Sequence, residues 1–220
     1  LASVAALAGD NIITEDELSL SRSGTQGGFS FDGSNDYLEG PIDDFGTSDF
    51  SLVFDILWDD APSGTEYLQA KAAGNNRWLV FVDATTYNLQ IYNGAGAGTT
   101  YTWTITPSVN HRSVIITADR SANATLYLNG ESQGTQDISA QSAVDLGSGN
   151  TQPPRIGYSS SSFDGKMFQV RYYNTLKTAG QVLNLAKGYN DTDSLWLHLS
   201  PTSTETNLWV DISGNQRSFS

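Results

Sequence analysis

Apolar and polar residues alternate in short segments along most of the chain, and turns rich in glycine, serine and asparagine separate the segments. This period of two is typical of half-buried β-strands. In Phe50–Trp58 the alternate apolar positions place one face in the core, and Trp58 and Trp78 are expected to be core residues. The pattern predicts strands at Phe50–Trp58, Arg77–Asp83, Tyr87–Asn93, Arg112–Asp119, Ala124–Ser132, Pro154–Tyr158 and Met167–Tyr173.

Turn and helix signals complete this picture. The dipeptide Asn129-Gly130 predicts a two-residue hairpin, because a type I′ turn needs a positive φ at both central positions. The segment Thr178–Tyr189 predicts the one helix, since Val182, Leu185 and Ala186 have helical spacing. Many short strands and one short helix near the C-terminal end predict an all-β fold of two stacked antiparallel sheets.

Composition narrows the function. The chain has 220 residues, 24 acidic and 11 basic side chains and a net charge of −13, so it fits one large domain whose acidic surface disfavours nucleic acid as a partner. It contains no cysteine, which excludes a thiol nucleophile and a zinc–cysteine site. No apolar run reaches the length of a membrane span, so membrane insertion is not expected.

Several segments, in this order, carry a family resemblance: FDGSNDY at Phe31–Tyr37, FSLVFDILW at Phe50–Trp58, LYLNGES at Leu126–Ser132, FDG at Phe163–Gly165 and the strand and helix at Met167–Tyr189. They resemble laminin-G-like, concanavalin-A-like jelly-roll domains. The resemblance implies a jelly-roll domain over 29–190, and residues 1–28 are expected to form an N-terminal arm or the first strands. Residues 191–220 form either an edge strand pair or a connector to a further module, because LWVDISGN at Leu208–Asn215 resembles the segment that precedes such a domain.

Jelly rolls of this kind include glycoside hydrolases, which need two carboxyl groups about 5–10 Å apart. The related glucanases carry them as E-x-D-x-x-E or E-x-D-x-E on one strand, and no strand here has that spacing. Asp55 and Asp59 share a strand face but would lie roughly 13 Å apart. The common hydrolase and nucleotide-binding motifs are also absent from the sequence. We therefore expect no enzymatic activity and assign no catalytic residues.

Aromatic and amide side chains beside a glycine-rich loop are the candidates for ligand binding. Trp and Tyr rings stack on the apolar faces of sugars, and the glycines of Asn93–Gly98 allow a ligand to approach the backbone. The alternative is that Tyr101 and Trp103 pack between the sheets, because they alternate with threonines. The candidate ligand-binding residues are Tyr92, Tyr101, Trp103, Asn75, Asn76 and Arg77.

Asp32, Asp36 and Asp164 are candidate calcium ligands, because calcium prefers carboxylate and carbonyl oxygens and these residues adjoin glycine and asparagine turns. Their two turns could meet, since the terminal strands of a jelly roll pair. The alternative is that each Asp only caps its own turn. Many relatives read I-D-E-V-R-x-Y in the closing strand, whereas Phe168 and Gln169 replace both acids here.

These observations favour a non-enzymatic, lectin-like recognition and adhesion module that binds glycan or a partner protein at a sheet face or loop rim. The alternatives are a structural module of a virus particle (a phage tail fibre or the capsid surface) or of a bacterial surface protein, and a glycoside hydrolase without the usual carboxylate motif. We expect it outside the cell, on a cell or virion surface, as part of a larger multi-domain or multi-subunit assembly. The fold cannot decide among these, because one sandwich supports unrelated functions.

Overall fold

The computed structural model describes residues 28–39, 45–71, 76–94, 98–147, 154–157, 160–189, 191–201 and 209–211, which form two antiparallel sheets and a short helix. Sheet A has eight strands in the order β10-β9-β8-β3-β12-β13-β14, with β1 also paired to β12. Its strands are β1 (Phe29–Asp32), β3 (Phe50–Trp58), β8 (Ser113–Ala118), β9 (Asn123–Leu128), β10 (Glu131–Asp137), β12 (Asp164–Tyr173), β13 (Leu195–Pro201) and β14 (Trp209–Asp211).

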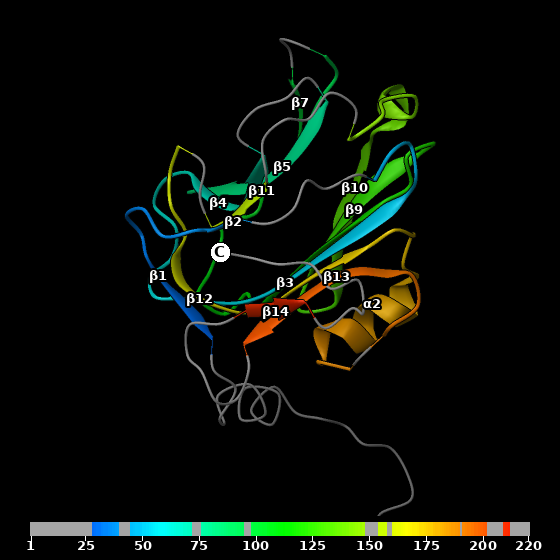
Figure 1. Ribbon diagram of the computed structural model, residues 1–220. Coiled ribbons are helices and arrows are strands. Elements are labelled where there is room, and N and C mark those ends of the chain that lie inside the picture. The colour runs from blue at the N-terminus through cyan, green and yellow to red at the C-terminus, as the bar shows by residue number, and fades with distance from the viewer. Residues whose placement is uncertain are drawn as a thin grey trace, which may run out of the picture.

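Sheet B has six strands in the order β2-β11-β4-β5-β6-β7 and lies against sheet A, as Figure 1 shows. Its strands are β2 (Leu38–Glu39), β4 (Glu66–Lys71), β5 (Arg77–Asp83), β6 (Thr86–Tyr92), β7 (Gly98–Trp103) and β11 (Pro154–Ile156). A 3-10 turn, η1 (Ser139–Gln141), follows β10. The predicted two-sheet antiparallel sandwich is confirmed.

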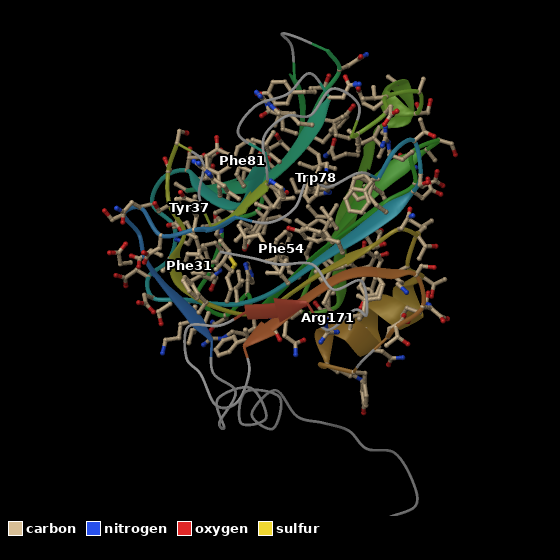
Figure 2. All side chains as sticks on the ribbon, in the orientation of Figure 1. Phe31, Tyr37, Phe54, Trp78, Phe81 and Arg171 are labelled. Atoms are coloured by element: carbon tan, nitrogen blue, oxygen red, sulfur yellow. The ribbon has the colours of Figure 1, made fainter. Side chains whose placement is uncertain are left out.

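The core fills the space between the two sheets, where Figure 2 shows Phe54 of β3 and Trp78 of β5. The Trp78 ring packs against Phe50 and Tyr172, with centroid distances of 6.1 and 5.4 Å. Trp58 is buried in the same cluster. The alternation in β3 therefore identified its core face correctly, and both tryptophans are core residues as expected.

The predicted hairpin is confirmed at the β9–β10 connection. Asn129 and Gly130 have φ values of 52° and 87°, as a type I′ turn requires. The Asn129 side chain also anchors the start of β8, because its Oδ1 atom accepts hydrogen bonds from the backbone N–H groups of Arg112 and Ser113.

Helix α2 (Ala179–Ala186) covers the outer side of sheet A, away from sheet B (Figure 1). Val182, Leu185 and Ala186 are its buried residues, as the spacing predicted. Thr178 and Gln181 form a capping box that fixes the start of the helix. The helix is shorter than the predicted Thr178–Tyr189, and Gly188 follows it with a φ of 83°.

Strand β12 pairs with strands from both the N-terminal and the C-terminal parts of the described residues. β3 lies along one of its sides, while β1 pairs with residues 164–167 and β13 pairs with residues 170–173 on the other. β13 and β14 pair with each other and so extend sheet A. Asp191 lies shortly before β13 and forms an ion pair with the buried Lys177, with Nζ and Oδ2 3.0 Å apart. Residues 1–27, most of the expected N-terminal arm, lie outside the described residues.

Candidate functional site

The outer face of sheet B carries the candidate site. Trp78, Val80 and Val82 of β5 point into the core, so the residues between them point outward. The same alternation turns Tyr87, Leu89 and Ile91 of β6 inward. The outer face includes Tyr67 on β4, Arg77, Leu79, Phe81 and Asp83 on β5, Asn88, Gln90 and Tyr92 on β6, and Thr100 and Thr102 on β7.

A row of amide and hydroxyl groups crosses β6 and β7 on this face. Asn88 faces Thr102 and Gln90 faces Thr100 in the strand register. The Thr102 hydroxyl donates to Asn88 Oδ1 at 2.8 Å, and Gln90 Nε2 donates to Thr100 Oγ1 at 3.0 Å. These bonds fix the positions of groups that can both donate and accept hydrogen bonds. The Gln90–Thr100 pair is exposed, so its remaining hydrogen-bonding capacity faces solvent.

Tyr92 ends this row beside Arg77, its partner across β5 and β6. The Arg77 guanidinium carbon lies 4.0 Å from the centroid of the Tyr92 ring, which is a cation–π contact. On β7, the facing residue is Gly98, where an added Cβ would lie 2.8 Å from the same ring. A larger residue at this position would therefore displace the ring.

Asn76 belongs to the same end of the sheet. Its Oδ1 atom accepts a hydrogen bond from the backbone N–H of Gly94 at 2.7 Å, which ties the start of β5 to the turn after β6. The structure thus brings three predicted ligand residues together, Asn76, Arg77 and Tyr92. Asn75, also predicted, lies outside the described residues.

Tyr101 and Trp103 belong to the core instead of an exposed platform. Their exposed fractions are 8% and 3%, and they face Leu89 and Tyr87, both of which point inward. Trp103 Nε1 donates to the Gly134 carbonyl at 2.9 Å, so the indole joins the edge of sheet B to β10 of sheet A. The prediction that these two rings contact ligand is wrong, because the other face of β7, with its threonines, points outward.

Sequence reasoning missed several residues of the outer face. Tyr67 and Phe81 form a half-buried aromatic pair in its centre, with ring centroids 5.3 Å apart (Phe81 is labelled in Figure 2). Gln90 and Thr100 also lie outside the predicted set of ligand residues. Their signal was present, since Asn88, Gln90 and Tyr92 alternate with apolar residues and the threonines alternate with Tyr101 and Trp103.

Asp83 lies at the opposite end of β5 from Arg77. It is the only acidic residue in the sequences of β5, β6 and β7. Its carboxylate accepts hydrogen bonds from the side chains of Thr65, Thr86 and Asn88. The chemistry of the outer face is therefore mainly that of hydroxyl, amide, guanidinium and aromatic groups.

The candidate calcium ligands lie at the paired ends of β1 and β12. Asp32 and Asp164 face each other in the register, so the two turns meet as expected. Asp32 Oδ1 accepts from the Ser34 N–H at 2.9 Å, and Asp36 Oδ2 accepts from the Asp32 N–H at 3.0 Å. No three His, Cys, Asp or Glu side chains of the described residues converge as a metal site would need. The Asp32 and Asp36 carboxylates thus accept hydrogen bonds within their own turn, and calcium binding stays a prediction.

Glu66 links the two sheets near these aspartates. Its Oε2 atom accepts a hydrogen bond from the Asp164 backbone N–H at 3.2 Å. Burial raises the pKa of the Glu66 carboxyl to about 7, and the negative charge of Asp164 adds to this effect, although the hydrogen bond opposes it. Burial and the charges of Asp59, Asp60 and Asp32 also raise the pKa of Asp164.

This raised pKa predicts a pH-dependent stability. The folded protein binds the Glu66 proton more tightly than the unfolded chain, so the free energy of unfolding should fall as the pH rises from about 4.5 to about 7. We expect Glu66 to contribute about 1–2 kcal/mol to this fall, allowing for its partial exposure. Urea unfolding of wild type and Glu66→Gln across this range measures the difference. Parallel pH profiles for the two proteins would refute the prediction.

Within the part of the chain that the structure describes, no helix is long and apolar enough to cross a membrane.

The family model for Laminin_G_3, described as concanavalin A-like lectin/glucanases superfamily, matches residues 32–183. No curated protein matches the sequence.

Solved structures share the fold at low sequence identity. A protein of Bacteroides ovatus, assigned as carbohydrate-binding, has a TM-score of 0.63 and 19% identity over 89% of this chain and 59% of its own. The SAP-like pentraxin of Limulus polyphemus has a TM-score of 0.53 and 16% identity over 74% of this chain and 82% of its own. The botulinum neurotoxin DC binding domain, solved with rat synaptotagmin II, has a TM-score of 0.51 and 10% identity over 66% of this chain. The present chain spans 37% of that toxin structure.

Proposed function

Because the chain belongs to the laminin-G-like family Laminin_G_3 of the concanavalin A-like lectin/glucanase superfamily, we propose that it is a non-catalytic recognition module that binds glycan on the outer face of sheet B. The family itself establishes only the fold, which also supports hydrolases. The case for glycan binding therefore depends on the residues of this face.

The observation that carries the proposal is the row of fixed polar groups that ends at an aromatic ring. Gln90 and Thr100 present hydrogen-bonding groups at an exposed position, and Tyr92 lies one alternate position further along β6. A sugar ring offers hydroxyl groups at its edge and apolar C–H groups on its faces. Hydroxyls can bond to the amide row, while the C–H face can contact an aromatic side chain.

The same face argues against hydrolysis. Glycosidic cleavage needs two carboxyl groups on either side of the bond. β5, β6 and β7 contribute only Asp83, which is bonded to Thr65, Thr86 and Asn88. We therefore propose binding without catalysis at this surface.

The comparisons are consistent with a binding role. The Bacteroides ovatus structure is assigned as carbohydrate-binding, and the toxin binding domain was solved in complex with a protein, rat synaptotagmin II. A protein partner for this chain is therefore an outcome that the experiment must be able to detect. An extracellular or surface location remains part of the proposal.

A glycan array with two variants tests the proposed surface. Tyr92→Ala and Gln90→Ala should each weaken binding to the glycan selected by the wild type about 5- to 150-fold, because each removes one contact of about 1–3 kcal/mol. Tyr189→Ala is the matched control, since this tyrosine is 53% exposed and lies next to the helix that covers sheet A. Melting temperatures of all variants separate lost binding from lost folding.

Unchanged affinity in both folded variants would show that glycan binds elsewhere. Absence of binding to the whole array, together with capture of a defined protein receptor, would favour a protein partner and contradict the proposal.

A further inference from the structure

Arg77 differs from the other buried or half-buried arginines whose hydrogen bonds are known. Arg120 donates to the carbonyls of Gln141 and Val144, and Arg171 donates to the Tyr189 carbonyl and to Gln169. The Arg77 side chain has no hydrogen-bond acceptor or acidic partner among the described residues, and its contact is with the Tyr92 ring. Its Nε atom is shielded from solvent without a bond, as are those of Arg120 and Arg171, so the difference lies in the terminal nitrogens.

From this difference we infer that the Arg77–Tyr92 pair makes the outer face of sheet B selective for glycans that carry an oxyanion, such as the carboxylate of an acidic sugar. The inference rests on the proposed function of this face and names the class of glycan. A guanidinium group presents a planar fork of N–H donors that matches the two oxygens of a carboxylate. Contact with the Tyr92 ring restricts the orientation of that fork before any ligand arrives.

The local charge supports an anionic ligand although the whole chain carries −13. Asp83 is the only acid on β5, β6 and β7, and it lies six residues from Arg77 along β5. That separation is roughly 20 Å in an extended strand. It exceeds the distance of about 8–10 Å over which charges interact strongly at physiological salt. The positive charge of Arg77 is therefore not neutralised by an acid on its own strand or on β6 and β7.

The groups around Arg77 fit a sugar that bears such a charge. Asn76 holds the turn at Gly94, and the Gln90–Thr100 pair follows Tyr92 along the row. An acidic sugar would place its carboxylate on Arg77 and its hydroxyl groups on the amide and hydroxyl row. A neutral sugar would offer the guanidinium only hydroxyl oxygens, whose hydrogen bonds are weaker than the paired, charge-assisted bonds of a carboxylate.

The test uses a glycan array built from matched sets in which the same oligosaccharide carries a carboxylate, a sulfate or no charged group. Wild type, Arg77→Gln and Arg77→Lys are compared with Lys166→Gln, which removes the same charge from an exposed position on sheet A. We expect wild type to prefer the charged members, and Arg77→Gln to bind them about 10- to 100-fold more weakly. Arg77→Lys should lose part of the affinity, because it keeps the charge and loses the fork. Lys166→Gln should bind like wild type.

The outcomes separate this inference from the proposed function. Preference for sulfated members alone would support the oxyanion site and identify sulfate as its ligand. Equal binding of charged and neutral members, unchanged in Arg77→Gln, would overturn the inference and leave glycan binding in place. Failure of the wild type to bind any member would contradict the proposed function itself, and the inference with it. Melting curves confirm that each variant is folded.

Discussion

We expect Gly165→Ala to lower the free energy of unfolding by about 3–5 kcal/mol, combining backbone strain with a steric clash. Gly165 has a φ of 140°, a conformation that residues with a Cβ rarely adopt. An added Cβ would lie 2.2 Å from the Leu57 carbonyl oxygen and 3.0 Å from the Trp58 Cα atom. These are backbone atoms of β3, so they cannot move without disturbing the pairing of β3 with β12.

Gly180→Ala is the matched control for this change. An added Cβ at Gly180 in α2 would meet nothing within 4 Å, so we expect a gain of about 0.5–1 kcal/mol from helix propensity. Chemical denaturation of the two variants provides the comparison. A loss below about 1 kcal/mol in Gly165→Ala would mean that the close approach of β12 to β3 is not as described.

Phe54→Ala should also cost about 3–5 kcal/mol, which is the usual effect of removing a fully buried phenylalanine. Phe54 has an exposed fraction of 0% and lies in the centre of β3, between β8 and β12. Its ring meets Tyr172 edge-on, with centroids 6.3 Å apart. The substitution removes contacts on several sides and leaves a cavity between the sheets.

Tyr189→Ala again provides the comparison, because a residue that is 53% exposed should change stability little. Denaturant unfolding measures the free energy of unfolding of both variants, and the curves are fitted with one shared m-value. If Phe54→Ala cost less than about 1 kcal/mol, the inner face of β3 would be assigned to the wrong side.

The sequence was sufficient for the fold because local patterns determined most of it. Alternation in Phe50–Trp58 identified the core face, and Asn129-Gly130 identified a hairpin whose geometry few other dipeptides adopt. Helix α2 followed from the spacing of its three buried residues. Each of these features depends on residues close together in the chain, which is why no structure was needed to predict them.

The site was predicted less well because it depends on which face of each strand points outward. Tyr92 lies on the polar face of its predicted strand, whereas Tyr101 and Trp103 alternate with threonines, which leaves their direction open. The pairing of β6 with β7 turns Tyr101 and Trp103 inward and Tyr92 outward. The partner strand of β7 could not be identified from its own residues, so both orientations remained open.

The role of Arg77 needed the structure for the same reason. The sequence placed Arg77 before a buried tryptophan, and it offered no means to recognise Tyr92 as its partner. In contrast, the meeting of Asp32 with Asp164 followed from the expected pairing of the terminal strands. The turn-capping bonds of the Asp32 and Asp36 carboxylates depend on local geometry that the sequence does not contain.

The most direct test of glycan binding on the outer face of sheet B is a map of backbone amide chemical shifts. The isotope-labelled chain would be titrated with the glycan that it selects on the array, and shift changes recorded for each assigned amide. We predict that the largest changes fall on β5, β6 and β7, at Arg77, Gln90, Tyr92 and Thr100. Changes confined to sheet A or to the turns at Asp32 and Asp164, with these four amides unaffected, would contradict the account.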